Sequence, residues 1–399
     1  MKKSVLIFGS YYLPGYRGGG PIRSIANIVS SLSDTFKFRI VTSDRDLHDK
    51  SPYDEVNVDR WNEVQSAEVF YARRTLSLFR NVVRILRSTP YDVLYLNSFF
   101  DARFTLLPLI LSRVGFVPKK PIVLAPRGEF SEGALEIKAK KKKTFIRLAK
   151  VVGLYDEVIW HAASGLEAED IAKAMSVPRE RIMIAPNITA SIQGVTSDVN
   201  LAAAFNESGT HERLKVCFLS RISPKKNLDF ALKVLSGVRI PIQFDIYGPR
   251  ELPSYWDSCQ EIISTLPGNI SARYCGSVAH EEVRATIAKY HLFFLPTQGE
   301  NFGHVFFEAW SVGVPVLTSD RTPWRELHAR GLGWDIELAH VEGFAGAIEA
   351  CACRSPHERA LHGARCVDFV RKFSEKAASG DLHRELFTRA SSEACAFPS

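Results

Sequence analysis

The chain has 399 residues, a length that is too great for one ordinary domain and fits two domains of typical size. Hydrophobic residues make up 46% of it and charged residues 24%, which excludes a disordered chain and predicts well-packed cores. The net charge is +7, and no apolar run approaches the roughly 20 residues that cross a bilayer. The seven cysteines are scattered, without the paired spacing of a zinc site. We therefore expect a cytoplasmic protein with reduced thiols.

Apolar runs and helical periodicity alternate through the first half of the chain. They predict strands at 5–8, 38–42, 93–97, 122–125, 157–160 and 182–185, with helices between them at 22–32, 75–88 and 166–175. This alternation predicts an α/β fold whose sheet is parallel and doubly wound.

A polar stretch from 187 to about 212 is the best candidate for a linker, and a second alternation follows it. Strands are predicted at 214–219, 243–247, 270–274, 291–295 and 316–318, and helices at 227–235, 256–266, 281–289 and 305–312. We therefore expect an N-terminal domain at 1–190, a C-terminal domain at 191–372, and a final helical segment with its tail at 373–399. Two such domains facing each other would place a ligand cleft between the carboxyl ends of their strands.

Two carboxylates flank a predicted strand-to-helix turn in the second half. Glu300 follows the apolar strand that ends at Pro296, and Glu308 lies inside the helix that Gly303 opens. The first N–H groups of a helix have no partner within it, so the turn suits a phosphate. A carboxylate beside it can accept hydrogen bonds from sugar hydroxyls. Acidic pairs at this spacing also occur by chance, so the interpretation depends on companion motifs.

Two further loops carry groups suited to phosphate. Gly18, Gly19 and Gly20 follow the first strand, where glycines let a backbone approach a phosphate closely. The run matches neither a dinucleotide fingerprint nor a P-loop, and a plain tight turn is the alternative. Arg221 and Lys226 follow the first strand of the second half, where arginine can bind phosphate through two bonds and lysine supplies a point charge. A solvated basic turn is the alternative for that pair.

The glycine-rich loop, the R-x4-K segment, Gly248-Pro249 after the next strand, and the E-x7-E segment together resemble the retaining glycosyltransferases of family 4. The resemblance rests on the order and spacing of these four motifs, is densest from 216 to 318, and is looser in the N-terminal half. It implies the GT-B fold, with two Rossmann-like domains, a cleft between them, and a C-terminal helix near 373–390 that crosses back to the first domain. It also implies a role in bacterial polysaccharide biosynthesis.

The resemblance further implies roles in binding a nucleotide-sugar donor. Arg221 and Lys226 would hold the diphosphate and stabilise the leaving nucleoside diphosphate, where negative charge develops during transfer. Glu300 would contact hydroxyls of the transferred sugar. The other donor-binding residues that it implies are Gly19, Gly20, Gly248, Gly276, Val278, Asn301, Phe302, Gly303, His304 and, for the ribose, Glu308. With fixed cations at the diphosphate, no metal and no other cofactor is expected.

One segment departs from the family pattern. Many members carry a histidine after the strand at 93–96, where this sequence has Asn97. A subset with such a segment also has the R-G-x-F form seen from Arg127 onward, so the resemblance implies acceptor-side roles for Asn97, Arg127 and Glu129. A structural role is the alternative, in which Asn97 caps a helix and Arg127 pairs with a neighbouring carboxylate.

A basic stretch lies just before residue 150. Five lysines fall within six residues, namely Lys138, Lys140, Lys141, Lys142 and Lys143. Apolar residues between 135 and 152 make the segment a basic amphipathic helix, which predicts either a solvated face or a surface for anionic lipid. A nucleic-acid patch is a third alternative, but no nucleic-acid-binding signature accompanies the lysines.

Asp44-Arg45-Asp46 has the D-x-D form that binds metal in the other large glycosyltransferase fold. It follows the second predicted strand without the surrounding pattern of that fold. We interpret it as a loop and expect no metal site there.

These observations predict a retaining, metal-independent glycosyltransferase that moves a sugar from a nucleotide-sugar to a glycan or lipid-linked glycan acceptor. The expected setting is cell-surface polysaccharide biosynthesis, such as that of an exopolysaccharide, in the cytoplasm or peripherally on the inner face of the plasma membrane. Two alternatives stay open. One is a nucleotide-sugar epimerase on the same fold, which would need a further acid/base set, and the other is a non-catalytic nucleotide-sugar-binding protein.

Overall fold

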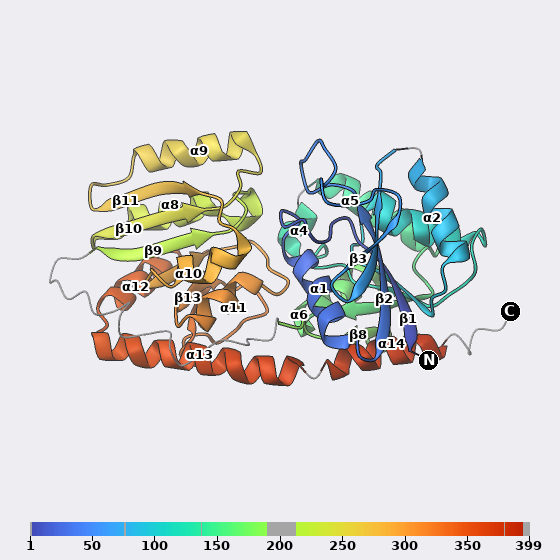
Figure 1. Ribbon diagram of the computed structural model, residues 1–399. Coiled ribbons are helices and arrows are strands. Elements are labelled where there is room, and N and C mark those ends of the chain that lie inside the picture. The colour runs from blue at the N-terminus through green and yellow to red at the C-terminus, as the bar shows by residue number, and fades with distance from the viewer. Residues whose placement is uncertain (1, 76, 137, 190–212, 379, 394–399) are drawn as a thin grey trace. The chain divides into compact units, whose positions relative to one another are not determined.

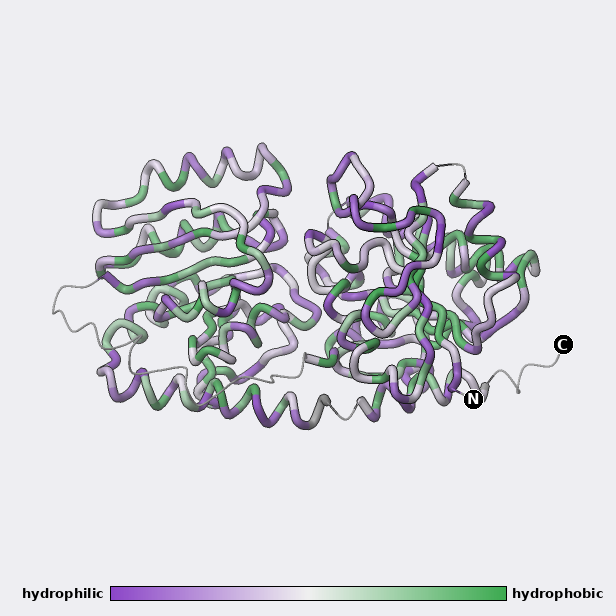
Figure 2. The backbone as a smooth tube through the Cα atoms, in the orientation of Figure 1, coloured by the Kyte–Doolittle hydropathy of each residue, from purple (hydrophilic) through white to green (hydrophobic). Residues whose placement is uncertain are grey.

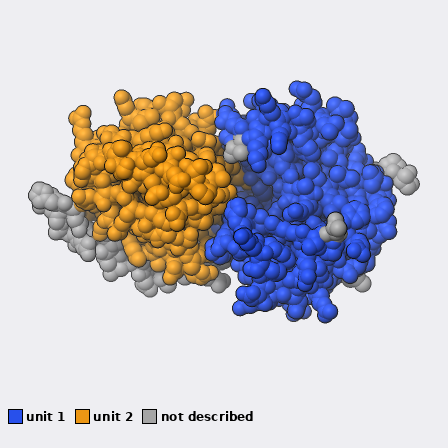
Figure 3. Space-filling view, turned by 90° about the horizontal axis from the view of Figure 1, so that it is seen from above, with its two compact units in different colours: residues 1–190, 377–399 blue, residues 191–376 orange. Residues whose placement is uncertain are grey.

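The computed structural model describes residues 2–75, 77–136, 138–189, 213–378 and 380–393. The chain forms two compact units (Figure 3): unit 1 contains residues 1–190 and 377–399, and unit 2 contains residues 191–376. Most of the predicted linker falls on 190–212, outside the described residues. Among the described helices, none is both long and apolar enough to cross a membrane.

Unit 1 is built on an eight-stranded sheet (Figure 1). Its strands are β1 (Lys3–Phe8), β2 (Phe36–Ser43), β3 (Trp61–Val64), β4 (Ala67–Ala72), β5 (Val93–Leu96), β6 (Ile122–Leu124), β7 (Val158–Ala162) and β8 (Ile182–Ile184). Its helices are α1 (Gly20–Leu32), α2 (Ser77–Ser88), α3 (Leu107–Arg113), α4 (Glu132–Glu136), α5 (Ala139–Val151), α6 (Gly165–Met175) and α14 (Asp381–Glu393), with short turns η1 (Ala102–Leu106) and η2 (Arg179–Arg181).

The sheet of unit 1 is covered on both faces, as its continuous apolar strands require. Successive residues of a strand point to opposite faces. In β1, Val5 and Ile7 pack with α1 and α14, whereas Leu6 and Phe8 pack with α2, α5 and α6. The strand order is β3-β4-β2-β1-β5-β6-β7-β8, and every pairing is parallel except that of β3 with β4.

Unit 2 contains a six-stranded, fully parallel sheet in the order β11-β10-β9-β12-β13-β14. Its strands are β9 (Leu214–Leu219), β10 (Ile242–Tyr247), β11 (Ile270–Gly276), β12 (Leu292–Leu295), β13 (Val316–Ser319) and β14 (Gly333–Ile336). Its helices are α8 (Leu228–Ser236), α9 (Pro253–Ser264), α10 (Val283–Ile287), α11 (His304–Ser311), α12 (Val341–Ala352) and α13 (Pro356–Ala378), with turns η3 (Pro224–Lys226) and η4 (His280–Glu282). Figure 2 shows hydrophobic residues concentrated on the strands of both units.

The predicted fold class, α/β with two doubly wound parallel sheets, is confirmed. In unit 2 the order corresponds to 3-2-1-4-5-6 when its strands are numbered along the chain, which is the Rossmann arrangement. The strand order therefore reverses between β9 and β12 in unit 2, and between β1 and β5 in unit 1. Ligands of such sheets bind outside the carboxyl ends of the strands at these points.

Two predicted helices are each divided in the structure. The lysine-rich segment forms α4 and α5, because Lys138 adopts a left-handed backbone (φ +58) that no helix interior accepts. Ile137, which we placed on this helix, lies outside the described residues. Likewise α13 ends at Ala378 and α14 begins at Asp381, with Gly380 between them at φ +59. The final helical segment is therefore two helices, of which α14 packs on unit 1.

Candidate functional site

The predicted residues of unit 2 gather where its strand order reverses. Lys226 ends η3 after β9, and Glu300 lies in the loop after the neighbouring strand β12. The Lys226 ammonium donates a hydrogen bond to a carboxylate oxygen of Glu300. Only 12% and 17% of the two side chains are exposed. A partly buried ion pair thus joins the loops that follow two neighbouring strands, β9 and β12.

Glu300 lies in a positive environment. Burial works to raise its pKa, but the charges of Lys226, Lys225 and Arg221 and the hydrogen bond from Lys226 hold the pKa below its ordinary value. The Arg221 guanidinium, 36% exposed, donates to Glu251 at 3.1 Å. Lys225, next to Lys226 in the basic turn, is half-buried and adds to this field. Three cations therefore act on one carboxylate.

Asn227, which the sequence analysis did not single out, holds the two loops together. Its backbone is left-handed (φ +63), a conformation that asparagine tolerates, and it precedes α8. Its Nδ2 donates to the carbonyl of Pro296 at 3.0 Å, and the carbonyl of Lys225 accepts from the Gln298 N–H at 2.8 Å. An asparagine directly after Lys226 at a helix start is the signal that could have identified it.

Gly303 opens α11 with a left-handed backbone, at φ +77 and ψ +63. A Cβ there would lie 2.5 Å from the ring of Phe306 and 3.1 Å from Cγ of Glu300. The Phe302 ring is buried, and its carbonyl accepts a hydrogen bond from the indole of Trp324. The core therefore fixes the first turn of α11 beside Glu300, which is where a helix N-terminus would meet an anion. The predicted contacts of the Phe302 and Gly303 N–H groups with a donor stay predictions.

Asn301 and His304 lie on either side of Phe302 and Gly303 in the same turn. The rings of Phe302 and His304 have their centroids 4.9 Å apart. Their predicted roles toward a donor also remain untested by these contacts.

Glu308 lies in the middle of α11. Its carboxylate is near His280, which follows β11. Nδ1 of His280 is 3.5 Å from Oε1 of Glu308. The loop that contains His280 starts from Gly276, at φ +85, and includes the half-buried Val278. The loop with the predicted donor-binding residues Gly276 and Val278 thus approaches Glu308 through His280. Sequence reasoning missed His280 because a lone histidine in a loop forms no motif.

Gly248 allows three strand ends to lie close together. A Cβ on it would lie 1.9 Å from the carbonyl oxygen of Ser220, and its φ is +132. Its N–H donates to the carbonyl of Gly276, and its own carbonyl accepts from the Tyr274 hydroxyl, both at 2.9 Å. A side chain here would push apart the loops after β9 and β10 and displace Arg221. Direct contact with a donor stays a prediction.

The glycine-rich loop of unit 1 leads into α1, with Gly19 at φ +73 just before the helix. The carboxylate of Asp46 accepts hydrogen bonds at 2.8 and 3.0 Å from the backbone N–H groups of the turn before it. Asp44 is buried and pairs with Arg45 at 2.8 Å. Both aspartates of the D-x-D form thus have structural partners. Among the described residues no group of three His, Cys, Asp or Glu side chains could hold a metal, and independence from metal stays a prediction.

The acceptor-side candidates Asn97 and Arg127 form one network at the carboxyl ends of β5, β6 and β8. The Arg127 guanidinium donates to Oδ1 of Asn97 at 2.6 Å, to Oδ1 of Asn187 at 2.7 Å and to the hydroxyl of Tyr95 at 2.7 Å. Neither structural alternative matches this arrangement, because Arg127 pairs with neutral groups and Asn97 accepts from Arg127. Asn187, which follows β8, also belongs to the network.

Glu129 serves a different purpose from Arg127. Its carboxylate accepts hydrogen bonds from the backbone N–H groups of Phe99 and Phe100 and from the Ser98 hydroxyl. Burial raises its pKa against the opposing effect of these bonds. Glu129 therefore shapes the loop after β5, and a direct acceptor contact stays a prediction.

The lysine-rich face of α5 is exposed, with one exception. Lys138, Lys140, Lys141 and Lys143 are exposed. Lys142 instead donates to the carbonyl of Ala134 at 2.6 Å and lies 5.1 Å from the ring centroid of Phe100. Burial lowers its pKa.

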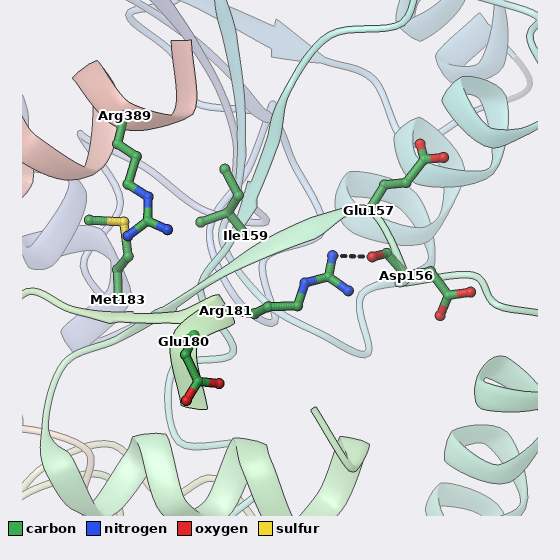
Figure 4. Close-up of a pocket in the computed structure, with 7 residues that line it drawn as sticks. All are labelled: Asp156, Glu157, Ile159, Glu180, Arg181, Met183 and Arg389. Atoms are coloured by element: carbon green, nitrogen blue, oxygen red, sulfur yellow. Dashed lines mark hydrogen bonds between the residues drawn. The ribbon is translucent and has the colours of Figure 1, made fainter. Parts of the chain in front are cut away.

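A cavity of about 400 Å³ lies elsewhere in unit 1, at the amino ends of β7 and β8 (Figure 4). Acidic and basic side chains line it together, and Arg181 donates to the backbone carbonyl of Asp156. None of the predicted site residues lines this cavity, so we assign the site to the carboxyl ends of the strands.

Part of the chain matches a known protein family. Residues 202–357 match the family described as glycosyl transferases group 1. The matched stretch lies within unit 2. The matched range contains Arg221, Lys226, Glu300 and Glu308, so the resemblance expected from the motifs is confirmed.

Solved structures show that the fold of the chain is that of GT-B glycosyltransferases. HepE from Anabaena, in complex with UDP and glucose, is 17% identical with a TM-score of 0.70, over 97% of this chain and 100% of that chain. WaaG, a glycosyltransferase involved in lipopolysaccharide biosynthesis, is 14% identical with a TM-score of 0.60, over 94% of this chain and 98% of that chain. At these identities the likeness establishes the fold.

A sequence relative is described as an uncharacterized 41.2 kDa protein in the cps region of Klebsiella pneumoniae. It is 23% identical over 283 residues, which cover 68% of this chain and 75% of the relative.

Proposed function

We propose that this glycosyltransferase moves a sugar, with retention of anomeric configuration and without a metal, from a nucleotide-sugar to a glycan or lipid-linked glycan in cell-surface polysaccharide biosynthesis. The observation that carries the proposal is the Lys226–Glu300 pair in the field of Arg221 and Lys225. Because the ammonium and the carboxylate touch, a phosphate bound to Lys226 lies next to Glu300. That arrangement suits a sugar phosphate, because Glu300 can accept hydrogen bonds from the sugar hydroxyls.

The same geometry suits the chemistry. When the bond between the sugar anomeric carbon and the diphosphate oxygen breaks, negative charge grows on the diphosphate. Arg221 and Lys226 are fixed cations that would stabilise this charge where it develops. In the front-face route, the acceptor oxygen attacks the same face and its proton passes to the leaving phosphate oxygen. This route needs no enzymic nucleophile.

The relatives support the donor class and the setting of the proposal. HepE is solved with UDP and also with UDP-glucose, which favours a nucleotide-sugar donor for this chain. The Klebsiella relative belongs to a cps region and WaaG acts in lipopolysaccharide biosynthesis, which favours a surface glycan as the product.

Incubation with a panel of UDP- and GDP-sugars, with and without a membrane lipid extract, tests the proposal. We expect nucleoside diphosphate to be released only when an acceptor is present, and the product linkage to keep the anomeric configuration of the donor. An epimerised donor without release would favour the epimerase alternative, binding without turnover would favour a non-catalytic protein, and an inverted linkage would contradict the retaining mechanism.

We further propose that α5 rests on an anionic membrane surface, where a lipid-linked acceptor would be found. Beside its exposed lysines, Leu148, Val151 and Val152 are 60%, 79% and 61% exposed. Val114, at the end of α3, is 68% exposed, and Arg113 next to it donates to the carbonyl of Gly153 at 2.7 Å. Basic and apolar groups on one face match an interface of anionic headgroups over acyl chains.

Replacing Lys140, Lys141 and Lys143 with glutamine should weaken binding to anionic liposomes. Each basic residue near such a surface contributes about 1 kcal/mol, so the loss should be on the order of 100-fold at low salt. Lys142 is left in place because its ammonium caps Ala134 within the fold. A charge-matched control replaces the exposed Lys233, Lys289 and Lys372 of unit 2. Equal liposome binding by both triple variants would refute the membrane role.

A further inference from the structure

Arg127 is a cation whose described contacts are all with neutral groups. Its three hydrogen-bond partners are two carboxamide oxygens and a phenol. Among the described residues, no carboxylate lies within ion-pair distance of it. Glu167, the carboxylate next to this network, accepts instead from the backbone N–H groups of Gly128 at 2.6 Å and Ala163 at 2.7 Å. The guanidinium therefore keeps its whole charge available.

The orientation of the two asparagines follows from the guanidinium. Arginine has five N–H donors and no acceptor, so the atoms of Asn97 and Asn187 that face it must be oxygens. Each carboxamide then turns its NH₂ group away from Arg127. In the described part of the chain neither of these nitrogens has a hydrogen-bond partner, and two of the five Arg127 N–H groups are also left over. The cluster is thus rich in donors and carries one positive charge.

A chain of hydrogen bonds holds Arg127 in place. The carbonyl of Ala185 can only accept, so Nε2 of His161 donates to it at 2.9 Å. Nδ1 of neutral His161 then accepts from the Tyr95 hydroxyl at 2.8 Å, and the same hydroxyl accepts from Arg127. Burial first, and the charge of Arg127 second, lower the pKa of His161 to about 3. The network is therefore pre-organised and contributes no other charge, as a binding site for an anion requires.

We propose that Arg127, Asn97 and Asn187 form an anion-binding subsite in unit 1 that takes an acidic group of the acceptor, either a phosphate ester or a sugar carboxylate. A guanidinium flanked by amide donors matches the oxygens of both groups. The donor diphosphate already has Arg221 and Lys226 in unit 2, so the anion in unit 1 belongs to the other substrate. This inference rests on the proposed transferase function.

Asparagine-to-aspartate variants test the subsite with little change of shape. Asn187→Asp and Asn97→Asp keep an oxygen against Arg127 and convert the bond into an ion pair. The fold should be kept or stabilised, while the positive charge is neutralised and an amide donor becomes an acceptor. The probes are farnesyl monophosphate and methyl glucuronide, titrated calorimetrically into the full chain saturated with UDP. We expect one of them to bind the wild type and to bind each variant at least about tenfold more weakly.

Controls separate this inference from the proposed function. Asn57→Asp adds the same charge at an exposed position before β3, at the opposite edge of the sheet, and should leave probe binding unchanged. Absence of binding by both probes, or equal binding by wild type and the aspartate variants, overturns the subsite. Weaker UDP binding in these variants overturns the assignment to the acceptor. A wild type that binds a probe but releases no nucleoside diphosphate from any donor would support the subsite while removing the transferase function.

Discussion

At the scale of single residues, Gly303 determines whether Glu300 can stay beside α11. Gly303→Ala should destabilise unit 2 by about 1–2 kcal/mol, the cost of a left-handed backbone with a side chain. Its Cβ would also crowd Phe306 and Glu300, so turnover of a nucleotide-sugar should fall as well. Thermal melting and donor turnover measure the two effects. Gly346→Ala is the control, because no atom lies near its Cβ in α12 and alanine there should stabilise the helix. Unchanged melting of Gly303→Ala would contradict this view.

Residue types could be predicted from the sequence, but their partners could not. Arg221, Lys226, Glu300 and Glu308 belong to motifs, whereas the contact of Lys226 with Glu300 spans 74 residues and depends on which strands are neighbours. The hydrogen bonds of Arg127 to two asparagines and a tyrosine likewise depend on the carboxyl ends of β5, β6 and β8 lying close together. Asparagines and histidines outside a motif, such as His280, are recognisable only once the sheet order is known.

At the scale of elements, α14 packs within unit 1 beside a pair of buried histidines. The rings of His161 and His383 have their centroids 5.2 Å apart, and burial lowers the pKa of His383 far below that of an ordinary histidine. The pKa of His161 is about 3, against about 6.5 in an unfolded chain. Between these pH values the unfolded state binds more protons, so the free energy of unfolding falls as the pH falls from about 6.5 towards 3.

His383→Phe should therefore reduce the dependence of the unfolding free energy on pH. One histidine that stays neutral contributes up to about 1.4 kcal/mol per pH unit within this window. Urea unfolding at pH 7 and pH 5 measures the difference between the two pH values, which should shrink in the variant. His357→Phe, at an exposed position of α13, is the control and should leave the difference unchanged. The same difference in all three proteins would contradict a neutral, buried His383.

The elements that sequence reasoning missed lack a local signal. β3 and β4 form an antiparallel edge hairpin around Gln65, whose φ is +52. Glutamine is not among the residues that indicate such a turn in a sequence. The single lysine-rich helix was a wrong prediction, because periodicity continues across Lys138 while the backbone does not. Long apolar strands, by contrast, were predicted within a few residues, since strands buried on both faces are hydrophobic throughout.

At the scale of the whole molecule, the strand order of unit 2 recurs in β4-β2-β1-β5-β6-β7 of unit 1, where β3 and β8 are added at the edges. Each unit carries predicted donor or acceptor residues where the order reverses or at the neighbouring strand ends. The alternation of strands and helices was sufficient to predict this architecture. Within it, we propose that Lys226, held against Glu300, stabilises the departing diphosphate. Charge reversal at Lys226 would place two carboxylates together, so Lys226→Gln is the cleaner change.

The most direct test is the rate of nucleoside diphosphate release at saturating donor and acceptor for the wild type, Lys226→Gln and the control Lys233→Gln, whose lysine is 63% exposed on α8. We predict that Lys226→Gln lowers this rate on the order of 100-fold or more while its melting temperature stays close to that of the wild type. The control should keep the wild-type rate. A folded Lys226→Gln protein that turns over its donor at the wild-type rate would contradict the account.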